Sequence, residues 1–244
     1  MIPLGGPVAA QGPVIPDFGE GSDCVVENRL FCPDWVRDNW SGTLQPALLE
    51  HVKLTIMAVA IGFVISFGAA LLTHRLRLFE KPLVVFAAIV YTIPSLALFQ
   101  LLVPITGLTT ATVEVALVGY TLLILYRNIL EGLRSVPPEV LEAARGMGFT
   151  RRQTLWRIEL PLAVPATMAG LRVAVVSTIA LATVAALVIP QGLGYPIFIA
   201  LREAFKTEIL VAGALAVGLA LVADALLVVA ERALTPWNRS RRAA

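Results

Sequence analysis

The chain has 244 residues, of which 57% are hydrophobic and only 15% are charged. Soluble domains carry about 25% charged residues, so the apolar excess excludes an ordinary water-facing globule and favours the bilayer as solvent. The formal net charge of only +2 gives no reason to expect a nucleic-acid partner.

Five apolar segments approach the length of about 20 residues that a membrane-spanning helix needs. In chain order they cover approximately residues 54–73, 83–105, 112–129, 162–189 and 209–230. Pro94 interrupts the second segment and predicts a kink, because proline lacks the N–H that a helix interior requires. The sequence therefore predicts an all-α integral membrane protein, with membrane lipid around a transmembrane domain at 51–232 and a tail at 233–244.

Positive charge is distributed unevenly between alternate connections. Twelve Lys and Arg residues follow spans one, three and five, against five in the N-terminal segment and the other two connections. By the positive-inside rule, the richer side faces the cytoplasm. A multi-pass protein of the cytoplasmic membrane is predicted, with its N-terminus outside and its C-terminus inside. Within the extracytoplasmic segment 1–50, residues 44–52 are expected to form an amphipathic helix lying on the membrane surface.

No metal site is predicted from the cysteines and histidines. Cys24 and Cys32 have no histidine or further cysteine near them at ligand spacing. An outside location permits a disulfide between them, and two free thiols are the alternative. His51 and His74 are isolated, and we interpret them as surface or interfacial residues rather than metal ligands.

The connection at residues 137–161 is the most informative part of the sequence. A proline pair suits the start of a helix, and Gly146 and Gly148 suit its end. A second short helix is expected over residues 151–159, before the fourth span. Two short helices on the cytoplasmic surface form a knob of the kind that fits a partner's groove.

This connection matches the EAA signature, and the chain resembles permease subunits of bacterial ABC importers. The matching residues are Glu142, Ala143, Ala144, Gly148, Ile158, Leu160 and Pro161. The resemblance implies a methionine-importer-like permease fold whose coupling helices, residues 137–161, dock into an ATPase subunit. It also implies two ATPase copies, a second permease that is identical or homologous, and an extracytoplasmic substrate-binding protein. ATP and Mg would belong to the ATPase; this chain has no visible nucleotide motif and is expected to bind no cofactor and to be no enzyme by itself.

Further segments are similar to the osmoprotectant branch of that family, namely residues 92–98, 125–132, 168–172 and 191–194. The resemblance implies import of quaternary ammonium compounds such as glycine betaine, choline and carnitine. Ile189-Pro190 and the cysteine-containing N-terminus depart from the branch. The alternatives are the same architecture importing an amino acid or another small solute, and a membrane sensor or scaffold that transports nothing.

Polar residues within the second span are interpreted as lining the translocation path. They are Tyr91, Thr92, Ser95 and Gln100, together with Pro94 at the kink. A kinked span is tolerated where protein or a water cavity satisfies the freed carbonyl. The alternative for each hydroxyl is a bond within its own helix. Tyr91, Tyr120 and Tyr126 either offer cation–π faces to a quaternary ammonium ion or simply pack.

Two charges fall inside the predicted spans. Arg172 and Asp224 lie at similar depth in spans four and five, given a rise of about 1.5 Å per residue. Charges in hydrocarbon are costly and face the bundle interior. We expect the two residues to pair, or to meet backbone or water separately, and so hold the bundle together; a role in the translocation path is the alternative.

Overall fold

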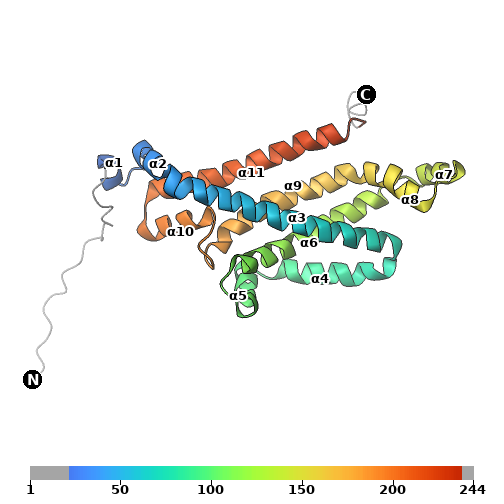
Figure 1. The fold of residues 1–244 in the computed structure, drawn as a ribbon, viewed down its shortest axis with the longest axis horizontal. Helices are drawn as coiled ribbons and strands as arrows, with labels where there is room; N and C mark the ends of the chain where they lie inside the picture. The colour runs from blue at the N-terminus through green and yellow to red at the C-terminus, as the bar shows by residue number, and fades with distance from the viewer. Residues whose placement is uncertain (1–21, 238–244) are drawn as a thin grey trace, which may run out of the picture.

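The computed structural model describes residues 22–237, and within that range the backbone is almost entirely helical, with no β-strand. Figure 1 shows the long helices running along the longest axis, with short helices at both ends. Residues 1–21 of the predicted extracytoplasmic segment and residues 238–244 of the predicted tail lie outside the described range. The predicted all-α architecture is confirmed for the described residues.

Four helices in this range are long and apolar enough to cross a membrane, and a bent helix pair makes a fifth when it is counted as one span. The four are α3 (Gln45–Arg75), α6 (Thr110–Arg134), α9 (Leu160–Ala185) and α11 (Lys206–Leu234). The bent pair is α4 (Glu80–Thr92) and α5 (Ser95–Thr106), preceded by a short 3₁₀ turn, η2 (Arg77–Phe79). Each predicted apolar segment therefore corresponds to one of these elements.

The second segment is broken rather than kinked. The axes of the helices before and after Pro94 differ by 102°. Ile93 and Pro94 both have extended backbone, with ψ of 129° and 134°. A residue before proline is pushed out of the helical region by contact with the proline ring, so two consecutive residues leave the helix and the chain turns sharply. The expectation of one kinked helix over residues 83–105 was wrong.

The expected separate surface helix at residues 44–52 was also wrong, because α3 begins at Gln45 and continues without a break into the membrane span. Pro33–Arg75 forms one helical rod, and the π-helical turn just before Pro46 accommodates the irregularity that this proline introduces. Three short elements precede α3 instead, namely α1 (Asp23–Val26), α2 (Pro33–Asn39) and a π-helical turn, η1 (Trp40–Leu44).

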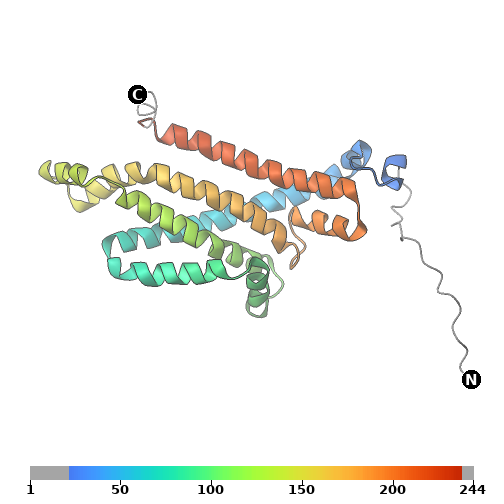
Figure 2. The same ribbon diagram turned by 180° about the vertical axis from the view of Figure 1, so that it is seen from behind.

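Successive spans alternate in direction along the longest axis (Figures 1 and 2). At one end lie α7 (Pro138–Gly146), α8 (Arg151–Thr154) and a second π-helical turn, η3 (Leu155–Glu159), together with the end of α11. At the other end lie α1, α2 and the turn between α10 (Gly194–Glu203) and α11. The connections predicted to be cytoplasmic therefore gather at one end of the molecule.

Helix α6 packs between α3 and α9 and forms the centre of the bundle. One buried cluster contains Leu54, Phe99, Leu117 and Ala182, and a second contains Ala70, Leu125, Ile129 and Ala163. Glycines let the helices approach closely, as is usual between membrane helices. At Gly132 an added Cβ would stand 2.9 Å from the carbonyl oxygen of Ala163, so α6 and α9 touch backbone to backbone.

Candidate functional site

The EAA connection folds into two short helices joined by a tight turn. Pro138 lies in the first turn of α7, and the helix ends at Gly146. Gly148 then takes a left-handed conformation with φ of +81°, which glycine adopts without a steric penalty. Thr150 and Gln153 form a capping box that starts α8: the Gln153 N–H donates to Thr150 Oγ1 over 3.3 Å, and the Thr150 N–H donates to Gln153 Oε1 over 2.8 Å.

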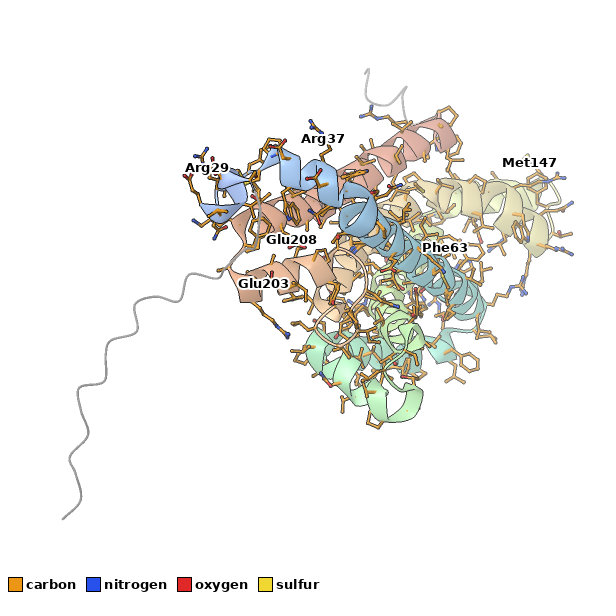
Figure 3. All side chains as sticks on the ribbon, turned by 60° about the vertical axis from the view of Figure 1, so that its left-hand side comes forward. Arg29, Arg37, Phe63, Met147, Glu203 and Glu208 are labelled. Carbon is orange, nitrogen blue, oxygen red and sulfur yellow. A yellow bond between two sulfur atoms is a disulfide. The ribbon has the colours of Figure 1, made fainter. Side chains whose placement is uncertain are left out.

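The predicted coupling residues differ in their solvent exposure. Only Ala144 among them is fully buried. The exposed or half-buried ones are Glu142, Ala143, Gly148, Ile158, Leu160 and Pro161. Met147 and Trp156 are large apolar side chains exposed on the same loop, and Figure 3 shows Met147 at the far tip of the molecule. An exposed apolar surface beside charged residues marks a protein contact.

The second helix of this loop is not a separate element, contrary to expectation. Arg151–Ala185 forms one continuous helical rod, so residues 151–159 lead directly into the fourth span. Pro161 lies in the first turn of α9, and the turn before it is π-helical, with the Leu160 N–H donating to Leu155 O. A wider π turn absorbs the irregularity that proline introduces. α8 therefore continues into α9 without an intervening loop.

The loop is also fastened to the first and third spans. His74 at the end of α3 bonds through Nε2 to Glu159 Oε2 over 3.0 Å. Leu155 belongs to the buried cluster around Leu125 and Leu133 of α6. The loop therefore contacts the first and third spans as well as continuing into the fourth.

A cavity of about 450 Å³ lies at the break between α4 and α5. Four of the five predicted path positions line it: Tyr91, Thr92, Pro94 and Ser95. Gln100 is not among the lining residues; it lies on the exposed side of α5. The opposite walls come from α6 and α9, and they add hydroxyl groups, including those of Thr121 and Ser177. The cavity is thus a mixed apolar and hydroxyl-lined space where the α4–α5 break meets α6 and α9.

Tyr120 of α6 contacts the α4–α5 break through its hydroxyl group and its ring. Its hydroxyl donates a hydrogen bond to the carbonyl oxygen of Ile93, a group that the broken helix leaves without a helical partner. Its ring meets the ring of Tyr91 edge to face, with centroids 6.0 Å apart. Thr92 Oγ1 donates to Ile89 O over 2.9 Å, so this hydroxyl bonds within its own helix. Tyr126 lies elsewhere, with its hydroxyl donating to Thr73 Oγ1 over 3.0 Å.

A second, larger cavity continues along the same pair of helices. It has a volume of about 1240 Å³ and lies between the end of α4 nearer the EAA loop and the matching end of α6. Its basic lining residues are Arg77, Lys81, Arg127 and Arg134. Arg134 makes two hydrogen bonds of 2.7 Å to the carboxylate of Glu80, which ties α6 to α4. The two cavities follow one another along α4 and α6.

The two predicted intramembrane charges meet each other. Arg172 Nε donates to Asp224 Oδ1 over 2.7 Å, and Nη2 donates to Oδ2 over 2.9 Å. This fork-to-fork geometry joins α9 to α11. Neither residue lines the cavity at the helix break. The geometry therefore favours the bundle-holding interpretation over a role in the path.

His51 is fully buried, and the interpretation of it as a surface or interfacial residue was wrong. Its Nδ1 accepts a hydrogen bond from the Leu193 N–H at 3.2 Å, so the proton resides on Nε2, which donates to Ile179 O at 3.0 Å. The neighbouring Glu50 accepts from the Gly192 N–H at 3.1 Å. Local sequence gives no signal for this contact, because the partners lie more than 120 residues away. Residues 22–237 contain no cluster of three metal-ligating side chains.

Cys24 and Cys32 are joined by a disulfide, the first of the two alternatives left open by the sequence. The bond closes a nine-residue loop at the end of the molecule opposite to the EAA connection (Figure 1).

Alternating spans, a helical loop bearing the EAA signature and a cavity at the broken span are together typical of a membrane permease. Residues 57–240 match the family described as binding-protein-dependent transport system inner membrane component, and the chain belongs to this family. It is a multi-pass inner-membrane permease component of an ABC transporter. It is 34% identical over 201 residues to the choline transport system permease protein OpuBB of Bacillus subtilis, covering 82% of this chain and 92% of that protein. It is also 34% identical over 208 residues to the osmoprotectant import permease protein OsmW of Salmonella typhimurium, covering 83% of this chain and 96% of that protein.

The fold is similar to that of a solved importer. An inward-facing structure of the MetNI methionine ABC transporter superposes with a TM-score of 0.67 at 20% sequence identity, covering 77% of this chain and 94% of that chain. The predicted methionine-importer-like permease fold is thus confirmed. The matched family residues begin at position 57, so the disulfide loop lies outside them.

Proposed function

We propose that this chain is the transmembrane subunit of an ATP-driven importer of quaternary ammonium osmoprotectants such as glycine betaine, choline and carnitine. The observation that carries the cargo assignment is the cavity at the α4–α5 break, where Tyr91 and Tyr120 present aromatic rings beside hydroxyl groups. Aromatic faces attract quaternary ammonium groups through cation–π interaction. Relatives named for choline and osmoprotectant transport support the same class of cargo.

The cavity also suits the other end of a betaine or carnitine molecule. The first turn of α5 begins at Ser95 on the cavity wall, and its backbone N–H groups have no helical acceptor. The positive end of a helix dipole favours a carboxylate, and half-helices of broken spans are used in this way in other transporters. Choline lacks a carboxylate and would rely on the aromatic rings alone.

In the proposed cycle, ATP is bound and hydrolysed by two separate ATPase subunits, with Mg, and this chain supplies the coupling loop. Residues 137–161 would enter a groove on one of the two ATPases, with Met147 and Trp156 among the contacting side chains. Closure of the ATPases would push α8, and the continuous rod into α9 together with the His74–Glu159 bond would carry that movement to the spans. A second permease copy or homologue would complete the path.

The proposed orientation places the EAA end in the cytoplasm and the disulfide loop outside. Basic residues concentrate in the connections at the EAA end, as the positive-inside rule requires of the cytoplasmic side. An extracytoplasmic binding protein would deliver cargo to the opposite end. The disulfide fits an oxidising compartment there.

The test is uptake by the complex purified from its host and reconstituted in vesicles with its binding protein. Labelled glycine betaine, choline and carnitine should accumulate only with ATP, and methionine should not. Tyr91→Leu should raise the half-saturating cargo concentration several-fold, whereas Tyr91→Phe, which keeps the aromatic face, should leave it nearly unchanged. Preferred uptake of methionine would move the cargo to the amino-acid class. Unaltered uptake in Glu142→Lys would contradict a coupling role for the loop, and absence of ATP-driven uptake of every solute by the wild-type complex would leave a sensor or scaffold as the better interpretation.

A further inference from the structure

The disulfide loop, residues 24–32, is fastened to a turn far away in the sequence. Asn28 Nδ2 donates to the carbonyl oxygen of Ala204 over 2.8 Å, and Asn28 Oδ1 accepts from the Lys206 N–H at 3.0 Å. Thr207 Oγ1 donates to Arg29 O over 2.9 Å. The Asn28 side chain thus bonds to one backbone carbonyl (Ala204) and one backbone N–H (Lys206) of the turn that connects α10 to α11.

Apolar packing under the disulfide loop reinforces these hydrogen bonds. Val25 and Cys32 form a buried cluster with Ala200 of α10 and Phe205 of the turn. The ring of Trp35 meets that of Phe205 edge to face at 5.1 Å. The loop is consequently a fixed part of this end of the molecule and not a loose tail.

The outer side of the disulfide loop is unexpectedly apolar. Val26, Leu30 and Phe31 expose 55%, 63% and 53% of their surface, so three of the nine residues in the loop are large exposed apolar side chains. Charged residues of the same loop, including the ion pair of Glu27 and Arg29, stand beside them. Exposed apolar groups with a charged rim mark an interaction surface.

The position of the loop narrows the choice of partner. In Figures 1 and 2, α1 lies beyond the ends of α3 and α11, at the end opposite to α7 and α8, and Figure 3 shows Arg29 and Arg37 at that end. The segment from Ser22 to Trp40 has four acidic and two basic residues, which disfavours contact with anionic lipid headgroups. The chain belongs to a family named for its dependence on a binding protein, and in the proposed orientation that protein would meet the end opposite to the ATPase.

We propose that the outer side of the disulfide loop is a docking surface for the extracytoplasmic binding protein of this importer. Val26, Leu30 and Phe31 would enter an apolar patch of that protein, and its rim would be basic to match Asp23, Asp34 and Asp38. The bonds of Asn28 connect this surface to the start of α11, so docking acts directly on a membrane span. The inference rests on the proposed function, because it uses the proposed orientation.

The test uses the complete permease–ATPase complex in lipid nanodiscs, titrated with its cargo-loaded binding protein. The double variant Leu30→Ser, Phe31→Ser should raise the binding-protein concentration at half-maximal ATPase stimulation about tenfold or more. Val26→Ser should raise it less. The matched control is Leu49→Ser, which removes an equally exposed leucine at the start of α3 and should leave that concentration within about twofold of wild type.

An unchanged half-maximal concentration in the double variant overturns the proposal. A fall in the amount of complex that inserts into nanodiscs, with that concentration unchanged, assigns the surface to the bilayer and also overturns it. Dissociation of the permease pair assigns it to a second copy, with the same consequence. These outcomes are separate from failure of the proposed function, in which the wild-type complex itself shows no stimulation by any loaded binding protein.

Discussion

The imidazole of His51 occupies the space that a side chain at Gly192 would need. A Cβ built on Gly192 would stand 2.9 Å from His51 Nδ1, and the glycine has φ of +65°. The ring is held there by the Leu193 N–H on one side and the Ile179 carbonyl on the other. The start of α3, the end of α9 and the turn into α10 are thus locked together around one neutral histidine.

Gly192→Ala is therefore expected to destabilise the protein. A left-handed backbone costs a non-glycine residue about 1–3 kcal/mol, and the contact with His51 adds to this. Gly213→Ala on α11 is the control, because nothing lies within 4 Å of its added Cβ and helix propensity favours alanine. Thermal unfolding in detergent should show a lower midpoint for the first variant alone; equal midpoints would mean that the turn relaxes freely.

The bond between Arg172 and Asp224 leads to a charge-exchange test. Removing Asp224 leaves a guanidinium without its partner within a membrane helix, so Asp224→Ala should lower the yield of folded protein several-fold. The exchange Arg172→Asp with Asp224→Arg should recover much of that yield. Leu221→Ala, one turn away on α11 with an exposed side chain, is the neutral control. Size-exclusion yield after membrane extraction measures the effect, and absence of rescue would show that the pair does not hold α9 to α11.

Gly146 and Gly148 of the EAA loop allow a test of whether coupling depends on the left-handed backbone of the turn. Both have open space around an added Cβ, but only Gly148 is left-handed. Gly148→Ala should therefore distort the turn between α7 and α8 and reduce ATP-driven uptake at least several-fold, whereas Gly146→Ala should retain uptake. Both variants should insert into the membrane equally. Equal uptake by the two variants would contradict a requirement for the left-handed turn.

Much of the fold follows from local composition. The bilayer demands about 20 apolar residues per span, so the five segments are visible without any knowledge of contacts. The EAA loop is predictable for a similar reason, since the proline pair and Gly148 encode its helix start and its turn within a few residues. The pairing of Arg172 with Asp224 was predictable because few partners for a charge exist at that depth.

The remaining features depend on contacts between distant parts of the chain. Nothing near His51 indicates that a glycine turn 141 residues later will close over its ring. The hydrogen bond between Asn28 and Ala204 joins positions 176 residues apart in the sequence. Both residues have a left-handed backbone conformation although neither is glycine. The 102° angle at Pro94 exceeds what proline alone imposes on a helix, and a tyrosine from another span satisfies the carbonyl that the break exposes.

That tyrosine supplies the last prediction. Tyr120→Phe keeps the ring but removes the hydrogen bond to Ile93 O, so the protein should lose about 1 kcal/mol of stability, the usual contribution of one such bond. The break should also become less well defined, which should raise the half-saturating cargo concentration because Tyr91 and Ser95 on either side of it line the cavity. Tyr195→Phe is the control, since its hydroxyl makes no hydrogen bond to residues 22–237 and its helix, α10, contributes nothing to that cavity. Uptake titrations in reconstituted vesicles, with unfolding midpoints measured in parallel, distinguish a local change at the break from general destabilisation. If Tyr120→Phe matches Tyr195→Phe in both measurements, the hydrogen bond does not maintain the break.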